Sequence, residues 1–120
     1  HGLRKGELIT FTAGSGIGKS LACREIACRL INSGETIGYI ALEESVRRSA
    51  LGLLGIHLNK PLHLSTDNLT QDELRTAFHA TLGSGRVYFY DHFGSINSDN
   101  LLRRIRYMAR GLDCGWIILD

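Results

Sequence analysis

The chain has 120 residues, a formal net charge of +2 and a hydrophobic fraction of 43%. This length suits about one domain with a real core, and the small charge neither requires nor excludes a nucleic-acid partner, because a local patch can outweigh the sum. No apolar run approaches the roughly 20 residues that span a bilayer, and the start lacks a signal-peptide apolar segment. We therefore expect a cytoplasmic protein with no membrane partner.

The first elements alternate between strand and helix patterns. Residues 7–12 are short, apolar and partly β-branched, which predicts a buried strand. A glycine-rich stretch follows, and then a helix over 19–33 that Gly34 ends. A second apolar strand is predicted over 36–42, and a second helix begins at Ser45.

The second half continues the alternation. A third helix is predicted over 69–82, with Thr70 as its N-cap and Glu73 placed for a capping box. An aromatic-rich strand follows over 86–90. Ser98 or Asn97 caps a fourth helix that runs to about Gly111.

The last predicted strand covers residues 115–119 and is closed by Asp120. Buried strands that alternate with helices indicate an α/β fold with a parallel sheet, flanked by helices and joined by right-handed crossovers. About four strands are expected. Because such sheets normally continue beyond this point, we expect residues 1–120 to form an incomplete domain.

The strongest motif lies between the first predicted strand and the first helix. Gly18, Lys19 and Ser20 match the end of a Walker A loop, and Ala13 stands at the position of its first glycine. The glycines allow a concave nest of backbone N–H groups, and the helix start adds a positive field. Lys19 is the expected cation for β- and γ-phosphates, and Ser20 the expected hydroxyl ligand of Mg²⁺. The motif predicts bound ATP and Mg²⁺, held by Gly14, Ser15, Gly16, Ile17, Gly18, Lys19 and Ser20.

Carboxylates follow three of the predicted strands. Asp120 closes the last one, where a Walker B acid would hold Mg²⁺ through water opposite Ser20. Glu43 is the preferred catalytic base, because it is nearer the strand tip than Glu44. The alternative is that both glutamates are ordinary helix-start acids. Asp91 also ends a strand and could join the same rim with His92, although a plain turn is the favoured interpretation there.

For two further groups of residues, a structural role is the favoured interpretation over a functional one. Cys23, Cys28 and Cys114 are odd in number and lack metal-ligand spacing, so we expect reduced residues in or near the core. Arg103, Arg106 and Arg110 share one face of the fourth helix and could contact DNA or a subunit, but a solvated face is the favoured interpretation.

The segments around Glu7, Lys19, Glu43 and Asp120 together resemble the ATPase core of ring-shaped replicative DNA helicases. The phage primase–helicase form is the most similar, with Twinkle-type and DnaB-type helicases as relatives. The resemblance implies a RecA-like fold that extends from just before Walker A to the Walker B strand.

This resemblance also implies an activity. It assigns the catalytic roles to Lys19 and Glu43 and the metal roles to Ser20 and Asp120. Hydrolysis of ATP would drive translocation on single-stranded DNA in a homo-hexamer, mostly through regions beyond this chain, so the chain alone should hydrolyse ATP slowly. A recombinase-type or clock-type ATPase, or a nucleotide-dependent assembly switch, remains an alternative because all share the P-loop.

Overall fold

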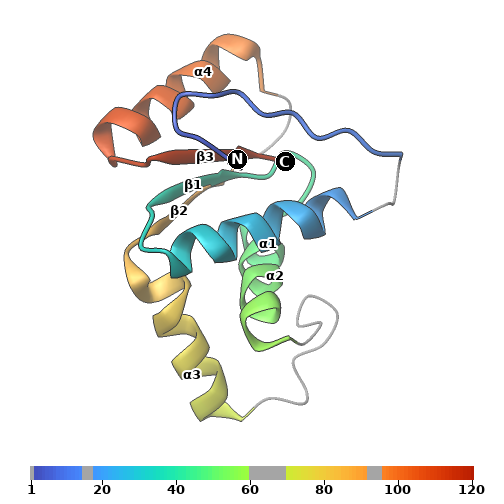
Figure 1. The fold of residues 1–120 in the computed structure, drawn as a ribbon, viewed down its shortest axis with the longest axis vertical. Coiled ribbons are helices and arrows are strands. Elements are labelled where there is room, and N and C mark those ends of the chain that lie inside the picture. The colour runs from blue at the N-terminus through green and yellow to red at the C-terminus, as the bar shows by residue number, and fades with distance from the viewer. Residues whose placement is uncertain (1, 15–17, 60–69, 92–95) are drawn as a thin grey trace.

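The computed structural model describes residues 2–14, 18–59, 70–91 and 96–120. Figure 1 shows a small sheet with helices packed around it. In chain order they are α1 Lys19–Asn32, β1 Ile37–Ile40, α2 Val46–Leu58, α3 Gln71–Ala80, the 3-10 turn Leu82–Ser84, β2 Val87–Tyr90, α4 Ser98–Arg106, the π-helical turn Tyr107–Gly111 and β3 Trp116–Leu119.

The sheet has the strand order β2-β1-β3, and both pairings are parallel. Ile37 at the start of β1 is opposite Val87 on one side and Trp116 on the other. All four residues of β1 are buried, as expected for a central strand that is covered on both faces. The predicted α/β class and the parallel sheet are confirmed.

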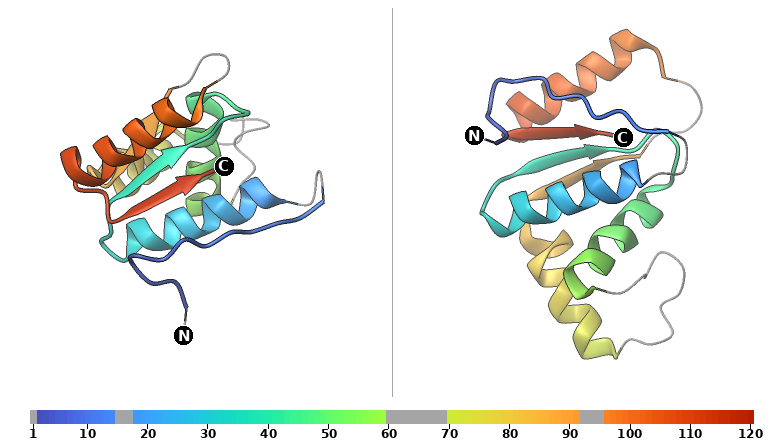
Figure 2. Two further views of the ribbon diagram at one scale, coloured as in Figure 1. Left: turned by 90° about the horizontal axis from the view of Figure 1, so that it is seen from above. Right: turned by 45° about the vertical axis from the view of Figure 1, so that its right-hand side comes forward.

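Two cores lie on opposite faces of the sheet, since successive side chains of a strand point to opposite sides. Tyr39 packs with Ile31 of α1 and Leu53 of α2 in one core. Ile40 packs with Met108 and Cys114 in the other. Figures 1 and 2 show the same arrangement, with α1 and α2 on one face and α4 on the other.

The helix starts follow from their capping residues. Ser45 and Thr70 accept hydrogen bonds from the amides of Arg48 and Glu73, both at 3.2 Å. Asn97 rather than Ser98 caps α4, because the Asn97 side-chain oxygen accepts from the amide of Asn100 at 2.8 Å. The predicted second, third and fourth helices therefore begin within two residues of their expected positions.

The cysteines also lie where they were expected. Cys28 and Cys114 are buried, Cys23 is half-buried, and all three are free thiols. Burial raises the pKa of Cys28 to about 11, and the nearby charge of Glu25 adds to this shift. Cys28 is therefore protonated and unreactive near neutral pH.

The strand predicted over residues 7–12 is wrong. The segment has no strand conformation, Leu8 is 96% exposed and Phe11 is 57% exposed. Among the described residues the sheet has three strands instead of about four. The physical reason is that a short apolar run supplies side chains but no pairing partner, and only backbone hydrogen bonds to a neighbour make it a strand.

The segment instead lies beside β3 and α1. Leu3, Ile9 and Phe11 help to line a pocket of about 150 Å³ together with residues of those two elements. Lys5 is tied to Glu35 by a salt bridge of 2.9 Å. Figure 2 shows this N-terminal segment running along α1 without joining the sheet.

Candidate functional site

Helix α1 begins with a backbone suited to receive an anion. Gly18 is its N-cap, in the left-handed region with φ 76° and ψ 25°, where a residue with a Cβ is strained. Among the described residues no side chain caps this end, and no acidic residue lies in the first turn. The amides of this first turn therefore have no side-chain acceptor within the described residues.

The predicted loop residues are only partly described. Lys19 is exposed and Ser20 is half-buried at the first two positions of α1, and Gly14 is exposed before it. Ala13 does not have a positive φ, which removes the steric objection to a residue other than glycine there. Ser15, Gly16 and Ile17 lie outside the described residues, so their predicted contacts stay predictions.

The parallel sheet brings the predicted acids to one edge. Because the strands run in the same direction, their carboxyl ends meet at that edge, and Figure 1 shows α1 starting on the same side. Glu43 follows β1, Asp91 follows β2 and Asp120 follows β3. Because the strand order is β2-β1-β3, Glu43 follows the strand next to that of Asp120, whereas Asp91 follows a strand on the far side of β1.

Asp120 is fixed by the backbone. Its amide donates to the carbonyl of Ile40, and its carbonyl accepts from the amide of Leu42, both at 2.8 Å. Burial first, and then the charge of Asp120, raise the pKa of Cys23, which lies one turn along α1 from Lys19. The Asp120 carboxylate therefore lies close enough to the first half of α1 to act on it electrostatically.

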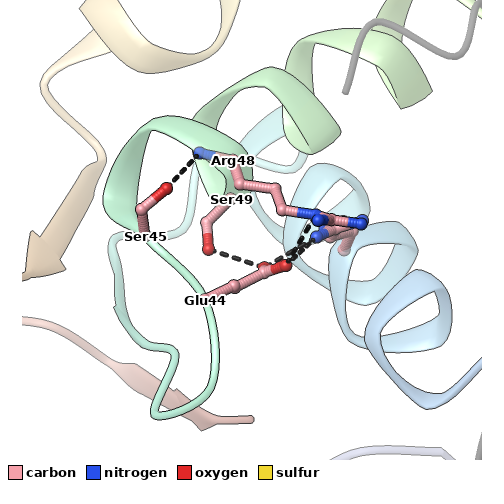
Figure 3. A network of polar contacts seen from close by, with 5 residues as sticks. Glu44, Ser45, Arg48 and Ser49 are labelled. Carbon is pink, nitrogen blue, oxygen red and sulfur yellow. Dashed lines mark hydrogen bonds and ion pairs between the residues drawn. The ribbon is translucent and has the colours of Figure 1, made fainter. Parts of the chain in front are cut away.

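Glu43 and Glu44 have different environments although they are adjacent. Glu44 accepts hydrogen bonds from Arg24 at 2.6 Å on each carboxylate oxygen and from Ser49 at 2.7 Å. Figure 3 shows Glu44 pointing into this group of side chains between α1 and α2. Glu43 is exposed and makes no hydrogen bond or ion pair with any part of the chain that the structure describes.

The pKa of Glu44 reflects these contacts. Burial acts to raise it, but the hydrogen bonds from Arg24 and Ser49, with the charges of Arg24 and Arg48, outweigh burial and lower it. A carboxylate held ionised and fully hydrogen-bonded is a poor proton acceptor. Glu43 is thus the glutamate that is free to act at this edge.

Arg24 is the residue that sequence reasoning missed. It is buried on the core face of α1, in helical register with Ala27, Cys28 and Ile31. A charged residue on an otherwise apolar face is a signal that can be read from the sequence, because a buried arginine needs a charged partner. Its partner, 20 positions away, could not be read in the same way.

The remaining predicted features lie apart from this edge or outside the description. Arg103 and Arg106 are exposed on α4, and Arg110 is exposed in the π-helical turn that follows it, on the sheet face opposite α1. His92 lies outside the described residues. No described helix is long and apolar enough to cross a membrane. The described residues also contain no group of three or more His, Cys, Asp or Glu side chains placed to hold a metal ion.

Comparison with known proteins shows a similarity to a phage replication protein. No protein-family profile matches the chain. The chain is 32% identical over 130 aligned residues to a DNA helicase/primase of Enterobacteria phage T3. The alignment covers 99% of this chain and 22% of that protein, so the chain spans about a fifth of its relative's length. Along nearly its whole length, the chain is therefore similar to one segment of a DNA helicase/primase.

Proposed function

We propose that the chain is the ATP- and Mg²⁺-binding part of a RecA-like replicative DNA helicase that unwinds duplex DNA while it moves along a single strand. The observation that carries the proposal is the shared edge. There α1 begins, with Lys19 and Ser20 as its first residues, on the side of the sheet where β1 and β3 end and are followed by Glu43 and Asp120. The similarity to a phage DNA helicase/primase supports the choice of helicase among P-loop ATPases.

The residues present fit a nucleotide and its metal ion. Gly18 leaves the first-turn amides without a side-chain cap, and the first turn of α1 has no acid that would repel phosphate. Mg²⁺ bound with a nucleotide needs few protein ligands, because phosphate oxygens and waters complete its shell. One hydroxyl from Ser20 and one carboxylate from Asp120 are enough for this role.

Each residue then has a defined task. Lys19 would donate hydrogen bonds to the β- and γ-phosphate oxygens of a bound nucleotide, and Ser20 and Asp120 would hold Mg²⁺, which would supply positive charge beside the phosphates. Glu43 orients the attacking water and accepts its proton. Asp91 could contribute to the same edge, but the proposal does not depend on it.

The proposed nucleotide site is tested by a substitution of Lys19 in the protein expressed from the complete reading frame. Lys19→Ala should weaken ATP binding about 10- to 100-fold, because a charge-assisted hydrogen bond contributes about 1.5–3 kcal/mol. Titration with a fluorescent ATP analogue measures this. Unchanged binding would refute the nucleotide site.

The helicase activity is tested by Glu43→Gln. This variant should still bind ATP but lose turnover about 10²–10⁴-fold, because general-base catalysis contributes about that much. Single-strand-stimulated ATP hydrolysis and unwinding of a forked duplex are the two measurements. If Glu43→Gln stops hydrolysis while assembly and partner binding continue and the unmodified protein unwinds nothing, the protein is an assembly switch and not a helicase.

A further inference from the structure

Arg24 of α1 and Glu44, which lies between β1 and α2, form a charged pair that is almost entirely buried. The Arg24 guanidinium donates from Nη2 to both oxygens of Glu44 at 2.6 Å, and these side chains are only 7% and 15% exposed. Figure 3 shows Glu44 of this pair pointing into the space between α1 and α2. Such short, charge-assisted contacts hold two groups in a narrow range of positions.

Helix α2 encloses the pair. Ser49, fully buried, donates to Glu44 at 2.7 Å. Gly52 leaves the space that Arg24 occupies, because a Cβ at Gly52 would lie 2.4 Å from the Arg24 Nε. Arg48 is a weak addition, since it is 59% exposed and its Nε lies 3.7 Å from the carboxylate.

The pair connects the two segments that carry the candidate site, the start of α1 and the segment after β1. Arg24 lies on α1, the helix that begins with Lys19, and Glu44 directly follows Glu43. A buried ion pair adds little net stability compared with apolar side chains of similar size, so stability alone is a weak reason for it. Catalytic geometry is a stronger reason, because a misplacement of about 1 Å can cost about 10²-fold in rate.

We propose that Arg24 and Glu44 are positioning residues, which fix the carboxylate of Glu43 relative to the first turn of α1. This inference rests on the proposed function, since it assigns the pair a role in the same hydrolysis. Neither residue contacts the nucleotide or takes part in proton transfer. The pair acts only by holding the segment after β1 against α1.

The main test removes the pair without leaving a lone buried charge. In the protein from the complete reading frame, the double variant Arg24→Met with Glu44→Gln should fold, because apolar or neutral replacement of a buried pair is commonly tolerated. Its kcat for ATP hydrolysis should fall about 10- to 100-fold. The KM for ATP should change less than about threefold, since the phosphate-binding residues are intact.

A milder variant keeps the test decisive if the double variant fails to fold. Ser49→Ala removes one hydrogen bond to Glu44 and leaves both charges, so kcat should fall about two- to tenfold. Arg47→Gln is the matched control, because Arg47 is exposed on the same turn of α2 and makes no hydrogen bond or ion pair with the described residues. It should keep kcat within about twofold of the unmodified protein.

Repeating the pair substitutions in a protein that already carries Glu43→Gln distinguishes a positioning role from a purely structural one. If the pair works through Glu43, the Ser49→Ala and double variants should cause no further loss once Glu43 is already replaced. A further loss of the same size in that background would overturn the positioning role, as would unchanged kcat in the folded variants.

If Lys19→Ala and Glu43→Gln behave as proposed while the pair variants are normal, only the positioning role fails. If Lys19→Ala binds ATP normally, the proposed function itself fails.

Discussion

At the scale of single residues, the two adjacent glutamates differ because of what lies across from them. Glu44 meets Arg24 and Ser49, which keep it ionised, whereas Glu43 meets solvent. The same carboxyl group is therefore engaged in a buried contact at one position and exposed at the next. In the folded chain these contacts lower the pKa of Glu44.

The pH dependence of stability follows from the lowered pKa of Glu44. A carboxyl whose folded pKa is below its ordinary value of 4.5 contributes stability above that pH, and this is lost as pH falls through the folded pKa. Glu44→Gln should lower the free energy of unfolding by about 3–5 kcal/mol at pH 7, because Arg24 is left unpaired. The gap should shrink below about pH 4.5, where the unmodified carboxyl also becomes neutral.

Urea unfolding of both proteins at a series of pH values measures this gap. Glu43→Gln is the matched control, since it removes the same charge from an exposed neighbour and should change the free energy of unfolding at pH 7 by less than about 0.5 kcal/mol. A gap for Glu44→Gln that stays constant from neutral to acidic pH would contradict the assignment of the pair.

At the scale of elements, close packing is made possible by glycines at two contacts. Gly52 of α2 faces the Arg24 side chain of α1, and Gly38 of β1 faces Met108 in the π-helical turn after α4. A Cβ at Gly38 would lie 2.5 Å from the Met108 sulfur and 3.0 Å from Ile117. Each glycine therefore sets how closely a helix can approach its neighbour.

Gly52→Ala separates helix propensity from packing. Propensity alone predicts a gain of about 1 kcal/mol, because alanine is the better helix former. The overlap with Arg24 predicts a loss of about 1–3 kcal/mol instead, since the guanidinium is held at its far end and cannot move freely. Denaturant unfolding measures the sign, and a stabilised variant would show that Arg24 adjusts at no cost.

At the scale of the whole molecule, one buried strand separates two cores. Tyr39 and Ile40 are neighbours in β1, yet one belongs to the core under α1 and α2 and the other to the core under α4. The two sets of buried residues share no member among those described. Truncations in the two cores should therefore act independently.

Leu53→Ala and Met108→Ala test this independence. Each residue is buried, so each substitution should cost about 2–5 kcal/mol. The double variant should lose the sum of the two within about 0.5 kcal/mol, as expected for sites without shared contacts. Leu102→Ala on the exposed face of α4 is the control and should cost less than about 0.5 kcal/mol. A large deviation from additivity in denaturant unfolding would indicate that the cores are coupled through the sheet.

The sequence by itself determined the local elements and their order. The capping side chains of Ser45 and Thr70, the glycine after the first helix and the apolar runs of β1, β2 and β3 all depend on residues a few positions apart. Such patterns act through backbone geometry and periodicity, which the tertiary environment does not need to supply. The parallel sheet, and with it the meeting of acids at one edge, followed from the alternation of strands and helices.

Only the tertiary structure decided which partners these elements meet. It paired Arg24 with Glu44 across 20 positions, while Glu43 stayed exposed and makes no hydrogen bond or ion pair with the described residues. It also left residues 7–12 outside the sheet, although their composition resembles that of a strand. The reason is the same in both cases: the energy of an ion pair or of a strand lies in a second group brought alongside, and no local pattern specifies that group.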